Sequence, residues 1–389
     1  MTVQDAVSIA DLHRLAKRRL PKIVFDYIEG GVEDELCLAR NENAFQRYAF
    51  VPRYLIDVAN CNQGKEIFGR RYSTSFGIAP TGMVGLFRPG GDLMLAKAAV
   101  QEDVPFILSG ASHTSIEEAA RAAPDHLWYQ LYAARDRRIA GDLIDRAKIA
   151  GVKTLVVTVD VPCHPKRERN LRNGFSYALR PRPLLMLEAL LHPGWMMNYY
   201  RTGGFSAFGD WLPYAGADAT PAQSIDTFNA QFPCPSHTWD EIAFYRSMWP
   251  GALVVKGIMH PDDARRAVGQ GADGIIVSNH GGRQLDRAAS PVEVFPSIKA
   301  AVGEQTVLML DSGIRRGADI IIAMCLGAQF VFAGRAMVYG VAAGGLVGVR
   351  RAIELLRREI DITLTQIGCA DVAMLTEEQL LARGDCRTG

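Results

Sequence analysis

One histidine in a glycine-rich segment is the residue of this chain best suited to proton transfer. His280 lies in residues 278–283, which read SNHGGR, and the two glycines leave room for a ligand beside the imidazole. Histidine titrates near neutral pH and accepts a proton without a large change of its pKa. Arg283 follows three residues later and offers a cation for an anionic group. We therefore interpret His280 as a catalytic base rather than as a structural histidine.

Two glycine–arginine motifs in the last quarter of the chain predict a phosphate site. Residues 311–317 read DSGIRRG, and Gly334 and Arg335 repeat the pairing after the next apolar run. Backbone N–H groups beside glycine, a helix N-terminus and arginine guanidinium groups all suit a phosphate dianion. Surface ion pairs are the competing interpretation. The repetition at two consecutive positions of the pattern favours phosphate.

Eight short apolar runs alternate with amphipathic stretches from about residue 74 onward. Most runs are nearly continuous in apolar residues, as in parallel strands covered on both faces. Helix starts follow them, for example the possible capping box of Ser115 and Glu118. Repeated strand–helix alternation predicts an α/β fold, a (β/α)8 TIM barrel, with a doubly wound open sheet as the alternative. The runs are 76–81, 105–109, 127–132, 154–160, 253–257, 274–279, 307–311 and 330–334.

Two parts of the chain lie outside this alternation, although we expect residues 1–389 to form a single domain. Residues 1–73 are predicted to be helices followed by a short hairpin that caps one end of the barrel. Residues 176–236, after the fourth strand, form an insertion far longer than an ordinary barrel loop. Its Leu, Met and aromatic clusters beside arginines fit either a helical lid, packed on the barrel or on a neighbouring subunit, or a monotopic membrane-contact segment.

The overall charge and the cysteines exclude several classes of protein. Lys and Arg total 43 and Asp and Glu total 42, so the net charge of +1 gives no basic excess for nucleic acid. The seven cysteines are scattered and form no Cys-x-x-Cys pair, so we predict neither a disulfide framework nor a metal site. The polar N-terminus does not resemble a signal peptide. These features predict a cytoplasmic protein, with peripheral contact to the inner face of a membrane as an option.

Active sites of such barrels form at the C-terminal ends of the strands. Polar side chains gather there, together with the base and the cations already described. The set predicts a site for a polar, planar ligand. Its members are Thr81, Ser109, Gln130, Tyr132, Thr158, Lys256, Ser278, His280, Asp311 and Arg335.

The order of these motifs resembles that of the FMN-dependent 2-hydroxy-acid oxidase and dehydrogenase family, whose members include glycolate oxidase, lactate dehydrogenases and (S)-mandelate dehydrogenase. The resemblance covers nearly the whole chain, but residues 176–236 match only loosely. It implies FMN as cofactor, a 2-hydroxy acid as substrate and a homotetramer. The matching segments are residues 25–27, 129–132, 256–257, 278–286, 311–315 and 334–335.

The resemblance also implies which residues bind the cofactor. Lys256 would place a cation near flavin N1, where it would stabilise the reduced, anionic ring. The other flavin-ring ligands would be Thr81, Ser109, Gln130 and Thr158. The ribityl and phosphate ligands would be Ser278, Asp311, Gly313, Arg315, Gly334 and Arg335.

For the substrate, the resemblance implies a carboxylate clamp and a base. Arg167 and Arg283, with Tyr27, would hold the carboxylate through charge-assisted hydrogen bonds. Tyr132 would bond the substrate hydroxyl and His280 would act as general base. Asp160 would orient the imidazole and stabilise its charge.

Two small residues indicate the size of the substrate. Gly82 and Ala111 stand where glycolate oxidase has an alanine and a tryptophan, so a bulky, mandelate-like acid is favoured, with lactate as the alternative. The electron acceptor is left open among a quinone, oxygen and a carrier protein. Other interpretations are a different FMN barrel, such as a flavin-type isopentenyl-diphosphate isomerase, and a catalytically silent flavin-binding module.

Overall fold

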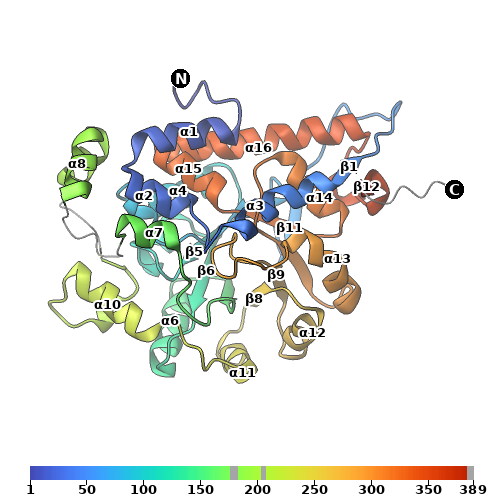
Figure 1. Cartoon of the computed structure of the whole chain (residues 1–389). Coiled ribbons are helices and arrows are strands. Elements are labelled where there is room, and N and C mark those ends of the chain that lie inside the picture. The colour runs from blue at the N-terminus through green and yellow to red at the C-terminus, as the bar shows by residue number, and fades with distance from the viewer. Residues whose placement is uncertain (176–182, 203–206, 383–389) are drawn as a thin grey trace.

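A closed barrel of eight parallel strands forms the centre of the molecule (Figure 1). The computed structural model describes residues 1–175, 183–202 and 207–382. The first strand pairs with the last, Ile78 with Ala333, so the sheet is closed and the open doubly wound alternative is wrong. The strands are β4 (Phe76–Ile78), β5 (Phe106–Ser109), β6 (Leu127–Tyr132), β7 (Thr154–Thr158), β8 (Ala252–Ile258), β9 (Gly274–Val277), β10 (Val307–Leu310) and β11 (Phe330–Ala333).

The predicted (β/α)8 fold is thus confirmed, although several strands are shorter than the apolar runs. Residues 80–81 and 160, for example, have left the ladder and continue as loops at the C-terminal ends. The helices that surround the strands are α4 (Gly91–Gln101), α5 (Ile116–Ala122), α6 (Arg137–Ile149), α11 (Trp239–Met248), α12 (Pro261–Gly269), α13 (Pro291–Val302), α14 (Gly317–Cys325), α15 (Arg335–Gly344) and α16 (Leu346–Ile367). The capping box expected at Ser115 and Glu118 begins α5.

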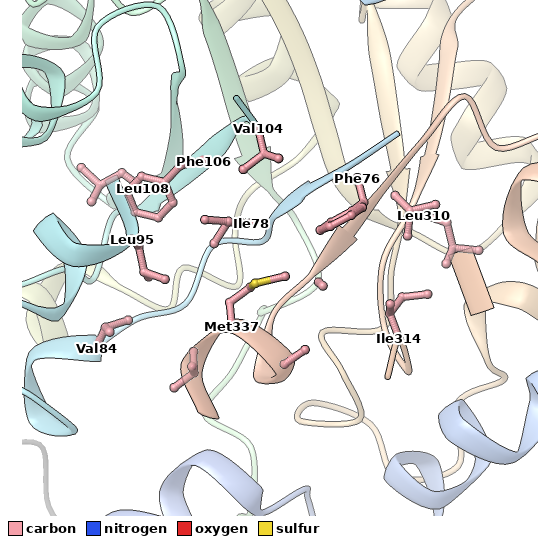
Figure 2. Close-up of a cluster of buried hydrophobic side chains, with 14 of the residues drawn as sticks. Phe76, Ile78, Val84, Leu95, Val104, Phe106, Leu108, Leu310, Ile314 and Met337 are labelled. Atoms are coloured by element: carbon pink, nitrogen blue, oxygen red, sulfur yellow. The ribbon is translucent and has the colours of Figure 1, made fainter. Parts of the chain in front are cut away.

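Alternation along the strands divides the core into two clusters. In β5, Phe106 and Leu108 face the surrounding helices, whereas Ile107 faces the barrel interior. Figure 2 shows the outer cluster, in which Leu95 of α4 and Met337 of α15 pack against strand residues such as Ile78. Both clusters are buried, which explains why the strands are apolar on both faces.

The N-terminal segment covers both ends of the barrel rather than one. The hairpin of β2 (Lys65–Ile67) and β3 (Arg70–Tyr72) places Ile67 and Tyr72 in the interior cluster, near the beginnings of the strands. The helices α2 (Lys22–Glu29) and α3 (Leu36–Asn43) lie at the opposite end, where Val32 N–H donates to the Gly282 carbonyl at 3.2 Å. The remaining elements of this segment are α1 (Ile9–Arg19), which packs on α15 and α16, and β1 (Tyr48–Phe50), which pairs with β12 (Leu380–Ala382).

The long segment between β7 and β8 contains separate helices with different surroundings. In α8 (Pro183–Leu191) and α9 (Pro193–Arg201) many apolar side chains are exposed, while α10 (Pro221–Gln231) packs near the barrel (Figure 1). The short α7 (Glu168–Asn173) contacts α2. Residues 176–182 and 203–206 of the predicted insertion lie outside the described residues. No helix in the described part of the chain combines the length and apolar character needed to cross a bilayer.

Candidate active site

A pocket opens at the C-terminal ends of the barrel strands. Most of the sequence-predicted site residues line it, although they come from α2, from the strand ends and from the loops after β7, β9, β10 and β11. Ser109, Asp160 and Ser278 are absent from the lining and stand directly behind residues that belong to it. The lining members of the predicted set are Tyr27, Thr81, Gly82, Gln130, Tyr132, Thr158, Arg167, Lys256, His280, Arg283, Asp311, Gly313, Arg315, Gly334 and Arg335.

His280 and Asp160 form a hydrogen-bonded pair at the wall of the pocket. His280 Nδ1 lies 2.9 Å from Asp160 Oδ1. An ionised carboxylate only accepts hydrogen bonds, so the bond assigns the proton to Nδ1 and leaves Nε2 as the nitrogen that can receive another proton. His280 has a left-handed backbone with φ of 59°, and Gly281 and Gly282 continue that conformation. The glycine-rich sequence thereby turns the imidazole toward Asp160.

Gly257 permits the close approach of Asp160. Its φ is +106°, and a Cβ built there would lie 2.6 Å from the Asp160 Cβ, closer than two carbons can approach. A register irregularity between Lys256 and Ile258 accompanies this contact. The motif Lys256-Gly257 was noted in the sequence, but a positioning role for Gly257 was not predicted.

Burial and charge set the protonation of this pair. Burial lowers the pKa of His280 below its ordinary value, and Lys256 and Arg167 add to this effect, whereas Asp160 opposes it. Burial also disfavours charge on Asp160, but His280 and Lys256 outweigh it and hold the pKa of that carboxyl below its usual range. The pair therefore consists of a carboxylate and a neutral imidazole at neutral pH.

Lys256 supplies a buried cation at the floor of the site. Its Nζ lies 3.1 Å from Asp311 Oδ2 and donates to Ser278 Oγ at 2.8 Å, and only 4% of the side chain is exposed. The same Ser278 hydroxyl accepts the backbone N–H of His280 at 3.1 Å. Lys256, Asp311, Ser278 and His280 thus form one connected network.

Two buried polar atoms in the pocket have no partner within the described part of the chain. They are Gln130 Nε2 and Thr158 Oγ1. Gln130 Oε1, in contrast, accepts the Ser109 hydroxyl at 3.2 Å, which fixes the amide and directs its N–H groups elsewhere. Buried polar atoms in native proteins are normally hydrogen-bonded. These orphaned atoms fit a ligand with hydrogen-bonding groups along a flat edge, such as a flavin ring.

The residues predicted to bind phosphate lie together between β10, β11 and the start of α15. Gly334 lines the pocket directly before the first turn of α15, and a Cβ on it would lie in ordinary contact with Ala79 Cβ at 3.7 Å. Arg315 and Arg335 line the same region. A helix N-terminus with two arginines nearby fits a phosphate.

Arg335 and Arg283 also have a structural role that the sequence did not predict. Arg335 donates to the carbonyl oxygens of Ile28 at 2.9 Å and Gly30 at 3.0 Å. Arg283 donates to those of Tyr27 at 2.8 Å and Gly30 at 2.9 Å, and its guanidinium lies 4.9 Å from the Tyr27 ring centroid. Arginines that bind the last carbonyls of a helix stabilise its C-terminal end. They therefore fix Tyr27 at the mouth of the pocket.

Two further features of the lining were not predicted from the sequence. They are the contact between Gly82 and Ala111 and the presence of three phenylalanines. Gly82 and Ala111 face each other across a narrow space, since a Cβ on Gly82 would lie 3.2 Å from Ala111 Cβ. Phe208, Phe228 and Phe232 line the pocket as well. They come from the segment between β7 and β8, where no strand register indicates which side chains face inward. The described residues contain no cluster of three or more His, Cys, Asp or Glu side chains that could hold a metal ion.

A barrel that offers orphaned donors to a flat ring, a buried lysine and a phosphate cradle belongs to the class of flavin mononucleotide oxidoreductases. Residues 16–382 match the FMN-dependent dehydrogenase family, and the chain belongs to that family. Its cofactor is FMN, and the family's members oxidise 2-hydroxy acids.

Relatives of known activity match over nearly the whole chain. The (S)-mandelate dehydrogenase of Pseudomonas putida is 40% identical over 385 residues, which cover 99% of this chain and 96% of that protein. An L-lactate dehydrogenase of Pectobacterium atrosepticum is 38% identical, with 95% and 96% covered. The crystal structure of the monotopic membrane protein (S)-mandelate dehydrogenase superposes with a TM-score of 0.94 at 40% identity, covering 97% of this chain and all of that one.

Proposed function

We propose that this enzyme oxidises a bulky (S)-2-hydroxy acid to the 2-oxo acid, with His280 as the general base. The observation that carries the proposal is the His280–Asp160 pair, 2.9 Å apart, in a pocket that is also lined by Arg167 and Arg283. A base and a pair of cations in one pocket suit a substrate with a carboxylate and an adjacent hydroxyl group.

The carboxylate of the substrate binds to the two arginines. Arg167 Nε donates to the Arg283 backbone carbonyl at 3.5 Å, so the two residues lie next to each other. Their guanidinium groups form charge-assisted hydrogen bonds with the carboxylate oxygens, and Tyr27 completes the clamp. Because Arg283 also binds the carbonyls at the end of α2 and Arg167 is bonded to Arg283, the clamp is arranged before the substrate arrives.

His280 Nε2 takes a proton from the substrate, and Tyr132 bonds the substrate hydroxyl and orients it. The resulting imidazolium is stabilised by the Asp160 carboxylate at Nδ1. FMN, when bound, supplies the ring that accepts the two electrons released by the substrate. The overall reaction removes two electrons and two protons from the 2-hydroxy acid.

The cofactor ligands proposed from the motifs are consistent with the pocket. Gln130 Nε2 and Thr158 Oγ1, the orphaned atoms, bind the flavin ring together with Thr81, and Ser109 holds the Gln130 amide. Lys256 places its charge beside the ring. Asp311 binds the ribityl chain while Ser278 stands behind the lining on Lys256, and the phosphate ligands are Gly313, Arg315, Gly334 and Arg335.

A bulky substituent on the substrate is supported by two small residues of the lining. Gly82 and Ala111 lie so close together that a side chain at position 82 would fill the space between them. Lactate is the second candidate substrate, since the relatives include L-lactate dehydrogenases. The expected homotetramer stays a prediction.

Replacing Arg283 by lysine tests the carboxylate clamp. We expect the KM for a 2-hydroxy acid to rise at least about 30-fold, as a loss of about 2 kcal/mol would give, because lysine cannot present the planar fork. Steady-state assays with (S)-mandelate and (S)-lactate and an artificial acceptor measure the effect. Arg287→Lys, an exposed substitution in the same loop, is the control and should leave KM unchanged. An unaltered KM in Arg283→Lys would contradict the role of Arg283 in the carboxylate clamp.

We further propose that α8 and α9 touch a membrane surface and that a membrane quinone is the electron acceptor. Leu190 is 65% exposed, Leu191 70% and Tyr200 84%. The other side of α9 is fixed to the barrel, since the Trp195 indole N–H donates to the Leu86 carbonyl at 3.1 Å. Such a two-sided arrangement suits an interfacial helix pair, and one similar structure is that of a monotopic membrane protein.

Vesicles of phosphatidylethanolamine and phosphatidylglycerol that carry a ubiquinone analogue test this contact. The holoenzyme should cosediment with the vesicles, and the double variant Leu190→Ser/Leu191→Ser should bind at least about tenfold more weakly. Ile362→Ser, which removes a 52% exposed apolar side chain on α16, should bind as the wild type does. Equal binding of all three proteins would contradict the membrane contact, and faster reoxidation by air than by the vesicles would favour oxygen as acceptor.

A further inference from the structure

Three phenylalanines from the segment between β7 and β8 form one side of the pocket. Phe208, Phe228 and Phe232 all line it, and each is less than one tenth exposed. The Phe228 ring of α10 is central, with its centroid 5.3 Å from that of Phe208 and 5.4 Å from that of Phe232. We name these three residues the phenylalanine wall. Tyr132, the proposed partner of the substrate hydroxyl, packs against it with its ring centroid 4.3 Å from that of Phe232.

The phenylalanine wall is fixed to the barrel by hydrogen bonds next to Phe208. Gly209 N–H donates to the Ser112 carbonyl at 3.1 Å, and the Trp211 indole N–H donates to the Gly110 carbonyl at 2.7 Å. Both acceptors belong to the loop after β5 that carries Ala111. The wall and the small residue that leaves space in the pocket are therefore held in one arrangement, so little conformational freedom is lost when a ligand binds.

The anchor beneath this segment is a buried carboxylate. Asp210 is fully buried, and its Oδ1 accepts the Ile116 N–H at the start of α5 at 2.8 Å. Arg146 Nη2 lies 3.3 Å from the same oxygen, and Arg146 Nη1 donates to the Asp210 carbonyl at 3.0 Å. These contacts bind the segment after Phe208 to two barrel helices. The wall is thus a rigid surface rather than a loose loop.

The lining of the pocket has a polar, charged part and an apolar part. Arg167, Arg283 and His280 bring the groups that bind and deprotonate a 2-hydroxy acid, whereas the phenylalanine wall offers only apolar rings. Aromatic rings bind another neutral ring through apolar burial and through edge-to-face or offset contacts. A methyl group would leave most of this surface uncovered.

We propose that the phenylalanine wall binds the aromatic ring of an aryl-substituted 2-hydroxy acid and selects it over a short aliphatic one. The inference rests on the proposed function and adds to it the specificity-determining residues Phe208, Phe228 and Phe232. Gly82 and Ala111 keep larger side chains out of the lining, and Phe228 contributes the central contact. The segment between β7 and β8 therefore determines the substrate specificity, and it also carries the proposed membrane contact of α8 and α9.

The first test compares two substrates in the holoenzyme. In Phe228→Leu we expect the ratio of kcat/KM for (S)-mandelate to kcat/KM for (S)-lactate to fall about tenfold or more, because leucine loses the ring contact but keeps an apolar side chain. Phe295→Leu, a fully buried substitution in α13 outside the pocket, is the matched control and should leave the ratio unchanged. An equal loss for both substrates would show that Phe228 only supports Tyr132 and would overturn the proposal.

The second test measures binding without turnover. Calorimetry on the wild-type holoenzyme should show phenylacetate binding at least about tenfold more tightly than propionate, and Phe232→Leu should remove most of this preference. Equal affinities in the wild type would overturn the phenylalanine wall as a ring site, even if 2-hydroxy acids are oxidised. A clear preference for phenylacetate in an enzyme that oxidises no 2-hydroxy acid would instead support the wall and contradict the proposed function.

Discussion

The His280→Ala holoenzyme should retain FMN and lose about 10²- to 10⁴-fold in the rate of flavin reduction by a 2-hydroxy acid, as expected when a positioned base is removed. The cofactor should stay bound because the proposed phosphate ligands, among them Arg315 and Arg335, are unchanged. Stopped-flow absorbance under anaerobic conditions measures the rate, and the flavin spectrum measures the FMN content.

The control for this variant is a histidine outside the pocket. His260, exposed at the N-cap of α12, can be replaced by alanine at a cost in local helix stability but without effect on flavin reduction. A near-normal rate of reduction in His280→Ala would remove this residue from the mechanism. The pair with Asp160 would then be a structural contact.

Asp160→Asn should slow flavin reduction by about 10²-fold or more and shift its pH dependence toward lower pH. The rate requires neutral His280, so it falls as the pH drops through the His280 pKa. Burial has already lowered this pKa below about 6.5, and Asp160 is the charge that opposes the shift. Removal of the carboxylate therefore lowers the His280 pKa further, so the acid limb of the profile moves to lower pH while the plateau falls.

Reduction rates measured from pH 4.5 to 8 give the acid limb of the pH profile for the wild type and for Asp160→Asn. A purely structural role of Asp160 would lower stability and leave the acid limb where it is in the wild type. A limb that moves to higher pH would contradict the assignment of Asp160 as the anion beside the imidazole, because the loss of an anion cannot raise the pKa of a neighbouring histidine.

The barrel and the polar residues at the C-terminal ends of its strands could be predicted from the sequence, because each depends on local patterns. Buried parallel strands are apolar on both faces, and polar residues that end such runs meet at one end of a closed barrel. Thr158 at the end of β7 and Lys256 near the end of β8, for example, are register partners on neighbouring strands. Several strands were predicted too long at their C-terminal ends, because residues such as Asp160 leave the strand to reach the site.

Contacts between distant segments could not be predicted in the same way. The bonds from Arg335 and Arg283 to the end of α2 join residues more than 250 positions apart, and the sequence presented both arginines only as ligand-binding groups. The hairpin of β2 and β3 lies at the opposite end of the barrel from α2. The phenylalanine wall belongs to a segment without strand periodicity, so nothing in its sequence indicates which rings face the pocket.

Anaerobic titration of the FMN-loaded enzyme with (S)-mandelate tests the central claim most directly. We expect the flavin absorbance near 450 nm to disappear with about one equivalent of substrate and the 2-oxo acid to form in equal amount, since each substrate releases two electrons to one flavin. The (R)-enantiomer should leave the spectrum unchanged. A yellow enzyme that is bleached neither by (S)-mandelate nor by (S)-lactate would contradict the oxidation of 2-hydroxy acids at this site.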